Sequence, residues 1–257
     1  MNRNIGIFFC RCNVPVISDT SMDEIAESLK DMDVPIIEMR DLCSLSVREK
    51  GELEEALNSF SKAIFIACYP RAVRSMLIQA GINPGNSETI SFKEYTPKQI
   101  LQKIKEQSGA PIGKADYRIM ESELDIPAWY PVIDQSRCIL CGKCAKFCLF
   151  GVYHFDRKSL KVVHPLACKN QCPACGRTCP TSAIIFPRMP EKSPLAGAEP
   201  DKDLKSNENG SLFVLLNERN RNRRSIFREG IVQQAEEERR KALEELKNTQ
   251  NRKTKYD

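Results

Sequence analysis

The first 108 residues alternate short apolar runs with segments that are apolar on one side only. The continuous apolar runs are typical of buried strands, which we predict at 5–10, 34–39, 63–68 and 89–92. The amphipathic segments between and after them predict helices at 21–32, 47–60, 71–80 and 97–107. Strands that alternate with helices indicate an α/β domain over residues 1–108, built on a small parallel sheet with flanking helices.

The pattern changes after residue 108. Residues 109–130 are rich in glycine and proline and predict a linker, which ends at the only tryptophan, Trp129, and at Tyr130. We expect this aromatic pair to pack the linker onto the next domain, and the alternative is an anchor for a partner protein. Within the next domain, alternation over 151–163 predicts a hairpin.

The last part of the chain is polar. Residues 188–210 combine proline, charge and small polar side chains and predict a flexible linker. Residues 211–257 predict a tail in which 212–216 form an ordered apolar segment and 218–247 form a charged helix. The tail carries most of the net charge of +5, because 217–257 hold twelve Lys or Arg against eight acids. A solvated helix and a docking helix for an acidic protein both fit this pattern, whereas nucleic-acid binding is disfavoured because no aromatic residues interleave with the arginines.

Cysteine spacing carries the strongest chemical signal in the chain. Eight of the twelve cysteines fall within 42 residues, in two runs whose first three members are closely spaced and whose fourth is separated from the third by three residues. The runs are Cys138, Cys141, Cys144 and Cys148, then Cys168, Cys172, Cys175 and Cys179. Such spacing lets one loop wrap three corners of an iron–sulfur cube, while the fourth thiolate, at the start of a helix, reaches the other cluster.

The spacing therefore predicts two [4Fe-4S] clusters with crossed ligation. The ligands of one are Cys138, Cys141, Cys144 and Cys179, and the ligands of the other are Cys168, Cys172, Cys175 and Cys148. A pair of zinc knuckles is the alternative, but it leaves the fourth cysteine of each run without a role. With the ligand sets complete, His154 and His164 are expected to be surface or structural residues.

Residues 131–187 resemble dicluster bacterial-type 4Fe-4S ferredoxins. The resemblance rests on the two cysteine runs, on Gly142 and Gly176 where the backbone must approach closely, and on Pro180 after the last cysteine. It implies an α+β ferredoxin-like fold. The sequence departs from the family pattern at Leu149, where a proline would follow the first run.

The other four cysteines, Cys10, Cys12, Cys43 and Cys68, lie at or just after the ends of the first three predicted strands. Because the carboxyl ends of parallel strands share one edge of a sheet, we expect the four thiols to gather there. Cys10 and Cys68 also fit as small buried hydrophobes, but Cys12 and Cys43 lie in polar loop sequence. This arrangement leaves a metal or cluster site and plain packing both open.

Four segments of this domain resemble the N-terminal domain of the A subunit of heterodisulfide reductase, namely 5–12, 41–44, 67–71 and 80–84. The resemblance implies a third [4Fe-4S] cluster at Cys10, Cys12, Cys43 and Cys68. Arg11, Asn13 and Tyr69 stand where the family tends to have histidine, glycine and serine. The flavin domain of that subunit has no counterpart, because G-x-G-x-x-G is absent from the sequence, so neither FAD nor NAD is expected on this chain.

Composition restricts where such a protein works. The start of the chain does not fit a signal peptide, and no apolar run approaches the roughly 20 residues of a membrane span. We therefore predict a cytoplasmic protein with no membrane span, in which many cysteines indicate metal rather than disulfides.

The sequence as a whole predicts an iron–sulfur electron-transfer protein or subunit that relays single electrons between redox proteins. The resemblance implies a heterodisulfide-reductase-like system of anaerobic metabolism, with a flavoprotein oxidoreductase as a candidate partner. The alternative is an oxidoreductase whose N-terminal cysteine site itself reduces a disulfide or small substrate, assisted by Arg11, Arg40 and Arg71. A third hypothesis is a redox-sensing module whose arginines at 219–228 contact nucleic acid.

Overall fold

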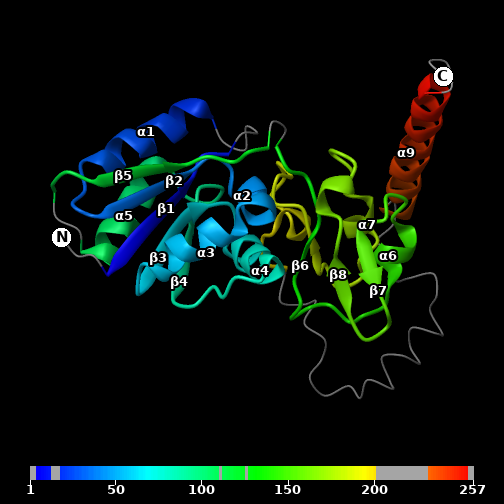
Figure 1. Cartoon of the computed structure of the whole chain (residues 1–257), viewed down its shortest axis with the longest axis horizontal. Helices are drawn as coiled ribbons and strands as arrows, with labels where there is room; N and C mark the ends of the chain where they lie inside the picture. The colour runs from blue at the N-terminus through cyan, green and yellow to red at the C-terminus, as the bar shows by residue number, and fades with distance from the viewer. Residues whose placement is uncertain (1–3, 13–17, 110–111, 125–126, 201–230, 254–257) are drawn as a thin grey trace.

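The computed structural model describes residues 4–12, 18–109, 112–124, 127–200 and 231–253. An α/β unit forms one end of the molecule, a smaller cysteine-rich unit follows it, and a long helix stands at the far end (Figure 1). The predicted segment 212–216 and the arginines at 219–228 lie outside the described residues.

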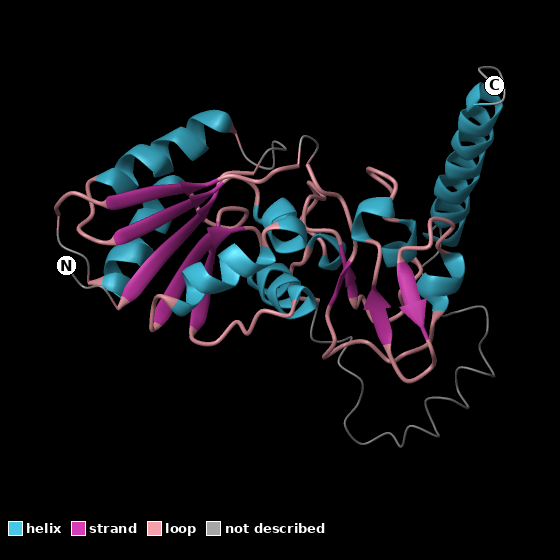
Figure 2. Cartoon of the chain, in the orientation of Figure 1, coloured by secondary structure: helices cyan, strands magenta, loops and turns pink. Residues whose placement is uncertain are grey.

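The α/β unit is built on a five-stranded sheet in which every strand pair is parallel (Figure 2). The strands are β1 (Ile5–Cys10), β2 (Pro35–Met39), β3 (Lys62–Ala67), β4 (Ser87–Ser91) and β5 (Asp116–Met120), in the order β4-β3-β1-β2-β5. The central strands β1 and β3 are almost entirely buried, as expected for continuous apolar runs covered on both faces.

Five helices connect and cover the strands. They are α1 (Asp19–Lys30), α2 (Leu42–Arg48), α3 (Lys50–Asn58), α4 (Pro70–Ala80) and α5 (Pro97–Ser108). Right-handed crossovers in this strand order place α1 and α5 on one face and α2, α3 and α4 on the other, and α1 does pack against α5 (Figure 1). The helix predicted over 47–60 is two helices, because Glu49 ends the first and begins the second.

Two predicted linkers are partly ordered. The stretch 109–130 contains β5, which pairs in register with β2 and extends the α/β unit to Met120. The stretch 188–210, expected to be flexible, is packed as far as it is described: Arg188 and Ala196 are buried, and the short 3-10 helix η2 (Pro194–Ala196) lies in it. Backbone pairing with β2 orders the first stretch, and burial of side chains orders the described part of the second.

The cysteine-rich unit is a small α+β arrangement. Strand β6 (Val132–Ile133) pairs antiparallel with β9 (Ile184–Ile185), and β7 (Tyr153–Phe155) forms the predicted hairpin with β8 (Leu160–Val162). Its short helices lie within or beside the cysteine runs: α6 (Lys143–Phe147), the 3-10 turn η1 (Pro165–Ala167) and α7 (Ala174–Arg177). Cys148 caps the end of α6, whereas the start of a helix was expected there. Pairing of the first strand with the last closes the unit on itself.

The two units share an ordered boundary. Arg71, at the start of α4, donates Nε–H to Asp134 Oδ2 at 2.6 Å and also donates to the carbonyls of Pro194, Ala198 and Ser182. The expected aromatic packing is also present, since Trp129 stacks on Phe186 with ring centroids 5.4 Å apart. Tyr130 instead turns to the α/β unit, where its hydroxyl donates to the Cys43 carbonyl at 3.0 Å.

The long C-terminal helix is α9 (Ile231–Lys253), which packs on α7. Glu238 accepts from Arg177 Nε at 2.9 Å, Glu245 pairs with Lys169 Nζ at 2.8 Å, and Arg239 lies over the Phe147 ring. In the described part of the chain, no helix is both long and apolar enough to cross a membrane.

Candidate metal centres

The N-terminal cysteines lie at the topological switch point of the sheet. The chain leaves β1 toward β2 and then crosses back to β3, so the crevice at the carboxyl ends of β1 and β3 is the place where open α/β sheets bind ligands. Cys10 is the last residue of β1, and Cys68 directly follows β3. The expectation that these thiols gather at one sheet edge is therefore supported by the topology.

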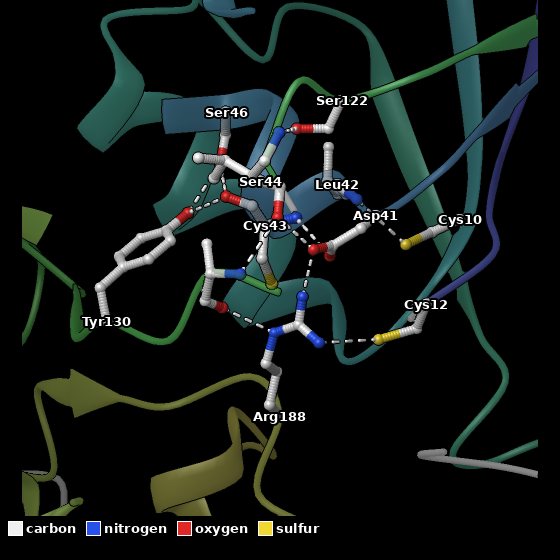
Figure 3. Close-up of polar contacts among 12 residues, drawn as sticks. Cys10, Cys12, Asp41, Leu42, Cys43, Ser44, Ser46, Ser122, Tyr130 and Arg188 are labelled. Carbon is white, nitrogen blue, oxygen red and sulfur yellow. Dashed lines mark hydrogen bonds and ion pairs between the residues drawn. The ribbon is translucent and has the colours of Figure 1, made fainter. Parts of the chain in front are cut away.

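The loop between β2 and α2 adds a third thiol. Asp41 has a left-handed backbone (φ 85°), caps α2 by accepting from the Cys43 N–H at 3.1 Å, and is fully buried. The next amide, of Leu42, donates to Cys10 Sγ at 3.4 Å (Figure 3). These contacts fix Cys43 beside the end of β1.

A buried arginine from the other unit completes the site. Arg188 follows β9, and its guanidinium donates to the Asp41 carboxylate, to Cys12 Sγ at 3.6 Å and to the Ala128 carbonyl at 2.7 Å. The sulfur atoms of Cys12 and Cys43 both point toward this guanidinium (Figure 3). The site thus combines residues of the α/β unit with an arginine from the segment after β9.

Lys93 holds that arginine in place. Its ammonium group donates to the carbonyls of Pro187 at 2.9 Å and Met189 at 2.7 Å, the two residues that flank Arg188. The Tyr69 ring lies 5.2 Å from the same nitrogen. Two cations and one carboxylate therefore surround the cysteines.

Burial dominates the electrostatics of these thiols. It raises the pKa of Cys10 and of Cys43 well above the usual value and the pKa of Cys68 to about 11, and the neighbouring cysteines raise all three further. Burial works to lower the pKa of Arg188, but Cys43 and Asp41 outweigh it and raise that pKa. Cys12 acts on the pKa of each of the other three thiols. Deprotonation of thiols in so dry a place calls for a strong local positive charge, such as a metal.

The arginines that sequence analysis put beside this site have other partners. Arg11 pairs with Asp23, Arg40 Nε lies 3.0 Å from Glu38, and Arg71 pairs with Asp134. These contacts lend no support to the suggestion that the three arginines lower the pKa of the thiols or bind a substrate there, which stays a prediction.

In the cysteine-rich unit, four thiols line one narrow hollow. They are Cys138, Cys141, Cys144 and Cys179, the three leading cysteines of the first run and the last of the second. Burial and, after it, the charge of Cys179 raise the pKa of Cys144 to about 12. The set brought together is the one that crossed ligation predicts.

The remaining four thiols also influence one another. Burial raises the pKa of Cys168, and Cys172 and Cys148 raise it further; Cys175 responds in the same way to Cys168 and Cys148. The Tyr153 hydroxyl donates to Cys175 Sγ at 3.1 Å. Cys148 thus acts on two thiols of the second run, which agrees with crossed ligation.

A single metal ion and a cubane cluster require different spacings of the thiols. Among the described residues, no three Cys, His, Asp or Glu side chains converge closely enough to bind a single metal ion. One zinc needs four ligands about 2.3 Å from the same point, whereas the thiolates of a cubane each bind a different iron and stand further apart. His154 and His164 are exposed, which agrees with their expected surface role.

Two glycines and a tryptophan add to the fit. A Cβ at Gly142 (φ 68°) would lie 2.2 Å from the Phe155 ring, and one at Gly176 would lie 2.3 Å from Leu195. Glycine therefore lets the backbone of both cysteine runs pack closely against neighbouring side chains.

Near the N-terminal site, the buried indole N–H of Trp129 has no hydrogen-bond partner among the described residues, and Trp129 lines one crevice with Cys43 and Arg188. An acceptor such as a cluster sulfide fits this donor.

Comparison with known proteins supports an iron–sulfur site in the cysteine-rich unit. The profile of the family described as "4Fe-4S binding domain" matches residues 130–153. The chain contains a 4Fe-4S ferredoxin-type domain. The match supports at least one [4Fe-4S] cluster, while the total number of clusters stays a prediction.

A curated relative agrees. An uncharacterised ferredoxin of Methanocaldococcus jannaschii is 44% identical over 61 residues, which are 23% of this chain and 42% of that protein. The similarity thus spans about two-fifths of the relative's length. No solved structure matches the chain. The resemblance of residues 1–108 to the heterodisulfide reductase subunit stays a prediction.

Sequence reasoning missed Asp41, Lys93 and Arg188. Asp41 directly precedes the Leu-Cys pair, so a capping aspartate could have been read from the pattern. No local signal marks Lys93 or Arg188, because their role depends on contacts across the boundary between the units.

Proposed function

We propose that this protein relays single electrons through three [4Fe-4S] clusters. Two are held by the crossed cysteine sets of the ferredoxin-type domain, and the third by Cys10, Cys12, Cys43 and Cys68. The ferredoxin-type domain and the ferredoxin relative support an electron-transfer role in general. The number of clusters and the ligand sets are the specific content of the proposal.

One observation carries the third cluster. Four thiols from three strand ends meet at the switch point of a parallel sheet, where Arg188 and Lys93 are at hand to balance negative charge. A packed cysteine needs no such counter-charge. Thiolates bound to iron do need it, because they outweigh the positive charge of the iron–sulfur core.

Direct packing between the N-terminal cysteine site and the second cysteine run supports electron transfer between them. Trp129 lines one crevice with Cys43 and stacks on Phe186, and Phe186 lies against Gly176, the neighbour of Cys175. The N-terminal site and the second cysteine run are therefore separated by a few packed side chains. Such a short, dry connection suits electron transfer within one chain.

The proposed setting is a heterodisulfide-reductase-like or other flavin-dependent oxidoreductase system of anaerobic metabolism. The chain would act in the cytoplasm as an electron-carrying subunit whose flavin is on a partner, because no dinucleotide loop occurs in the sequence. The alternative, reduction of a disulfide by the N-terminal thiols themselves, is less well supported, since burial raises the pKa of Cys10, Cys43 and Cys68 and so disfavours the reactive thiolate.

Iron and acid-labile sulfide per chain test the proposal. Anaerobically purified protein should hold about twelve irons, and Cys43→Ser should hold about eight. About eight irons in both proteins would leave only the ferredoxin clusters. Zinc in place of iron would overturn the proposal altogether.

A further inference from the structure

The N-terminal cysteine site contains a charge that its own domain does not supply. Arg188 belongs to the segment after β9, 147 residues from Asp41 in sequence, yet its side chain is 2% exposed and lies among the cysteines. Arginine stays protonated in proteins, so this is a permanent positive charge in a dry site.

All three guanidinium nitrogens of Arg188 donate hydrogen bonds. Nε binds the Ala128 carbonyl, one terminal nitrogen binds the Asp41 carboxylate, and the other binds Cys12 Sγ. The Lys93 ammonium group donates hydrogen bonds to the carbonyls of Pro187 and Met189, on either side of Arg188. These bonds hold the backbone in the conformation that points the Arg188 side chain into the site. A guanidinium held in this way cannot reorient when the charge of the site changes.

We propose that Arg188 is the built-in counter-ion of the N-terminal site and raises the reduction potential of the cluster bound by Cys10, Cys12, Cys43 and Cys68. This inference rests on the proposed third cluster. One-electron reduction adds one negative charge to the site, the electron arrives from the ferredoxin-type domain or from an added reductant, and Arg188 keeps its proton throughout. A fixed positive charge nearby stabilises the reduced form more than the oxidised form.

A consequence for assembly follows. Arg188 reaches Asp41 and Cys12 only when the segment after β9 is docked on the α/β unit, and the interdomain pair of Arg71 and Asp134 holds the same boundary. The potential of the N-terminal site therefore depends on the docked arrangement of both units in the full chain.

The test is an EPR-monitored dithionite titration of the full-length protein. The N-terminal signal is identified as the one lost in Cys43→Ser. We expect Arg188→Gln to shift the equilibrium of that signal at least tenfold toward the oxidised form, about 59 mV for one electron. Arg188→Lys keeps the positive charge but loses the planar guanidinium group, so it should shift the equilibrium of that signal less.

Two variants separate charge from structure. Arg177→Gln removes a mostly buried arginine that binds Glu238 and Gln234 on α9 instead of a thiol, so the N-terminal potential should stay in place. Asp41→Asn combined with Arg188→Gln removes opposite charges together, so the potential should return toward the wild-type value. A purely structural role would instead reduce iron content without moving the potential of the clusters that form.

The outcomes distinguish the two proposals. Equal iron content of about eight in wild type and Cys43→Ser would remove the third cluster, and this inference with it. About twelve irons with an unmoved potential in Arg188→Gln would overturn this inference alone. Should Arg188→Gln fail to fold, Asp41→Asn reports with the opposite sign: leaving Arg188 unopposed should raise the potential, and an unchanged or lower value would overturn the inference.

Discussion

Tyr153 donates its phenolic hydrogen to Cys175 Sγ at 3.1 Å, from the hairpin strand β7 to helix α7 in the second cysteine run. The contact joins two segments that are 22 residues apart and is half shielded from solvent. Hydrogen bonds to cluster sulfurs are one of the means by which a protein sets a reduction potential, so this contact would connect the hairpin to the chemistry of the proposed second cluster.

Tyr153→Phe should lower the reduction potential of the second ferredoxin cluster and leave iron content unchanged. The hydrogen bond favours the more negative, reduced form, and its loss is expected to shift the equilibrium by up to roughly tenfold, or ~59 mV. Redox titration measures the shift. Tyr117→Phe is the matched control, because that hydroxyl binds Glu38 in the α/β unit instead of a cysteine. Equal shifts in both variants would contradict the assignment.

Crossed ligation makes a prediction about pairs of serine variants. Cys141→Ser with Cys179→Ser removes two ligands of one cluster and should cost about four irons, no more than either single change. Cys175→Ser with Cys179→Ser damages both clusters and should cost about eight. Metal analysis and EPR of purified variants decide the matter, since uncrossed ligation reverses the two results.

The ion pair between Arg71 and Asp134 should contribute to the stability of the domain boundary. Both side chains are mostly buried, so Arg71→Met leaves a carboxylate without its partner and is expected to lower the free energy of unfolding by roughly 3 kcal/mol. Anaerobic urea denaturation followed by circular dichroism measures the loss. The double variant Arg71→Met, Asp134→Leu should recover most of it, and a double variant as unstable as the single one would show that the charge is not the cause.

Helix α9 should protect the second cluster. Ala242 on α9 is 1% exposed, and nearby Glu238 and Glu245 pair with Arg177 and Lys169 beside the second cysteine run. Ala242→Lys should release the helix, raise amide exchange in α9 and speed cluster loss to an iron chelator several-fold. Leu243→Lys, at a 40% exposed neighbouring position, should behave like wild type. Unchanged chelation in Ala242→Lys would show that α9 does not cover the site.

Much of the architecture could be predicted from residues that act locally. The apolar runs that form β1 and β3 have few alternatives to a buried parallel sheet, and the strand ends bring Cys10 and Cys68 to one edge by geometry alone. The strand β5 was not predicted because it lies at the edge of the sheet and its residues are mostly exposed, so they do not form a continuous apolar run. The single helix predicted over 47–60 failed because apolar periodicity does not reveal a break at Glu49.

What the sequence by itself determined is the set of twelve thiols and the spacing from which their grouping is predicted, since spacing is a property of the local chain. What only the tertiary structure decided is the surroundings of those thiols. Arg188 looks like one charge in a polar linker until the fold buries it against Asp41, and Arg11, Arg40 and Arg71 look like site residues until carboxylates engage them. Charge acts through space and depends on burial, so its effect on the cysteines is decided only when distant segments pack together.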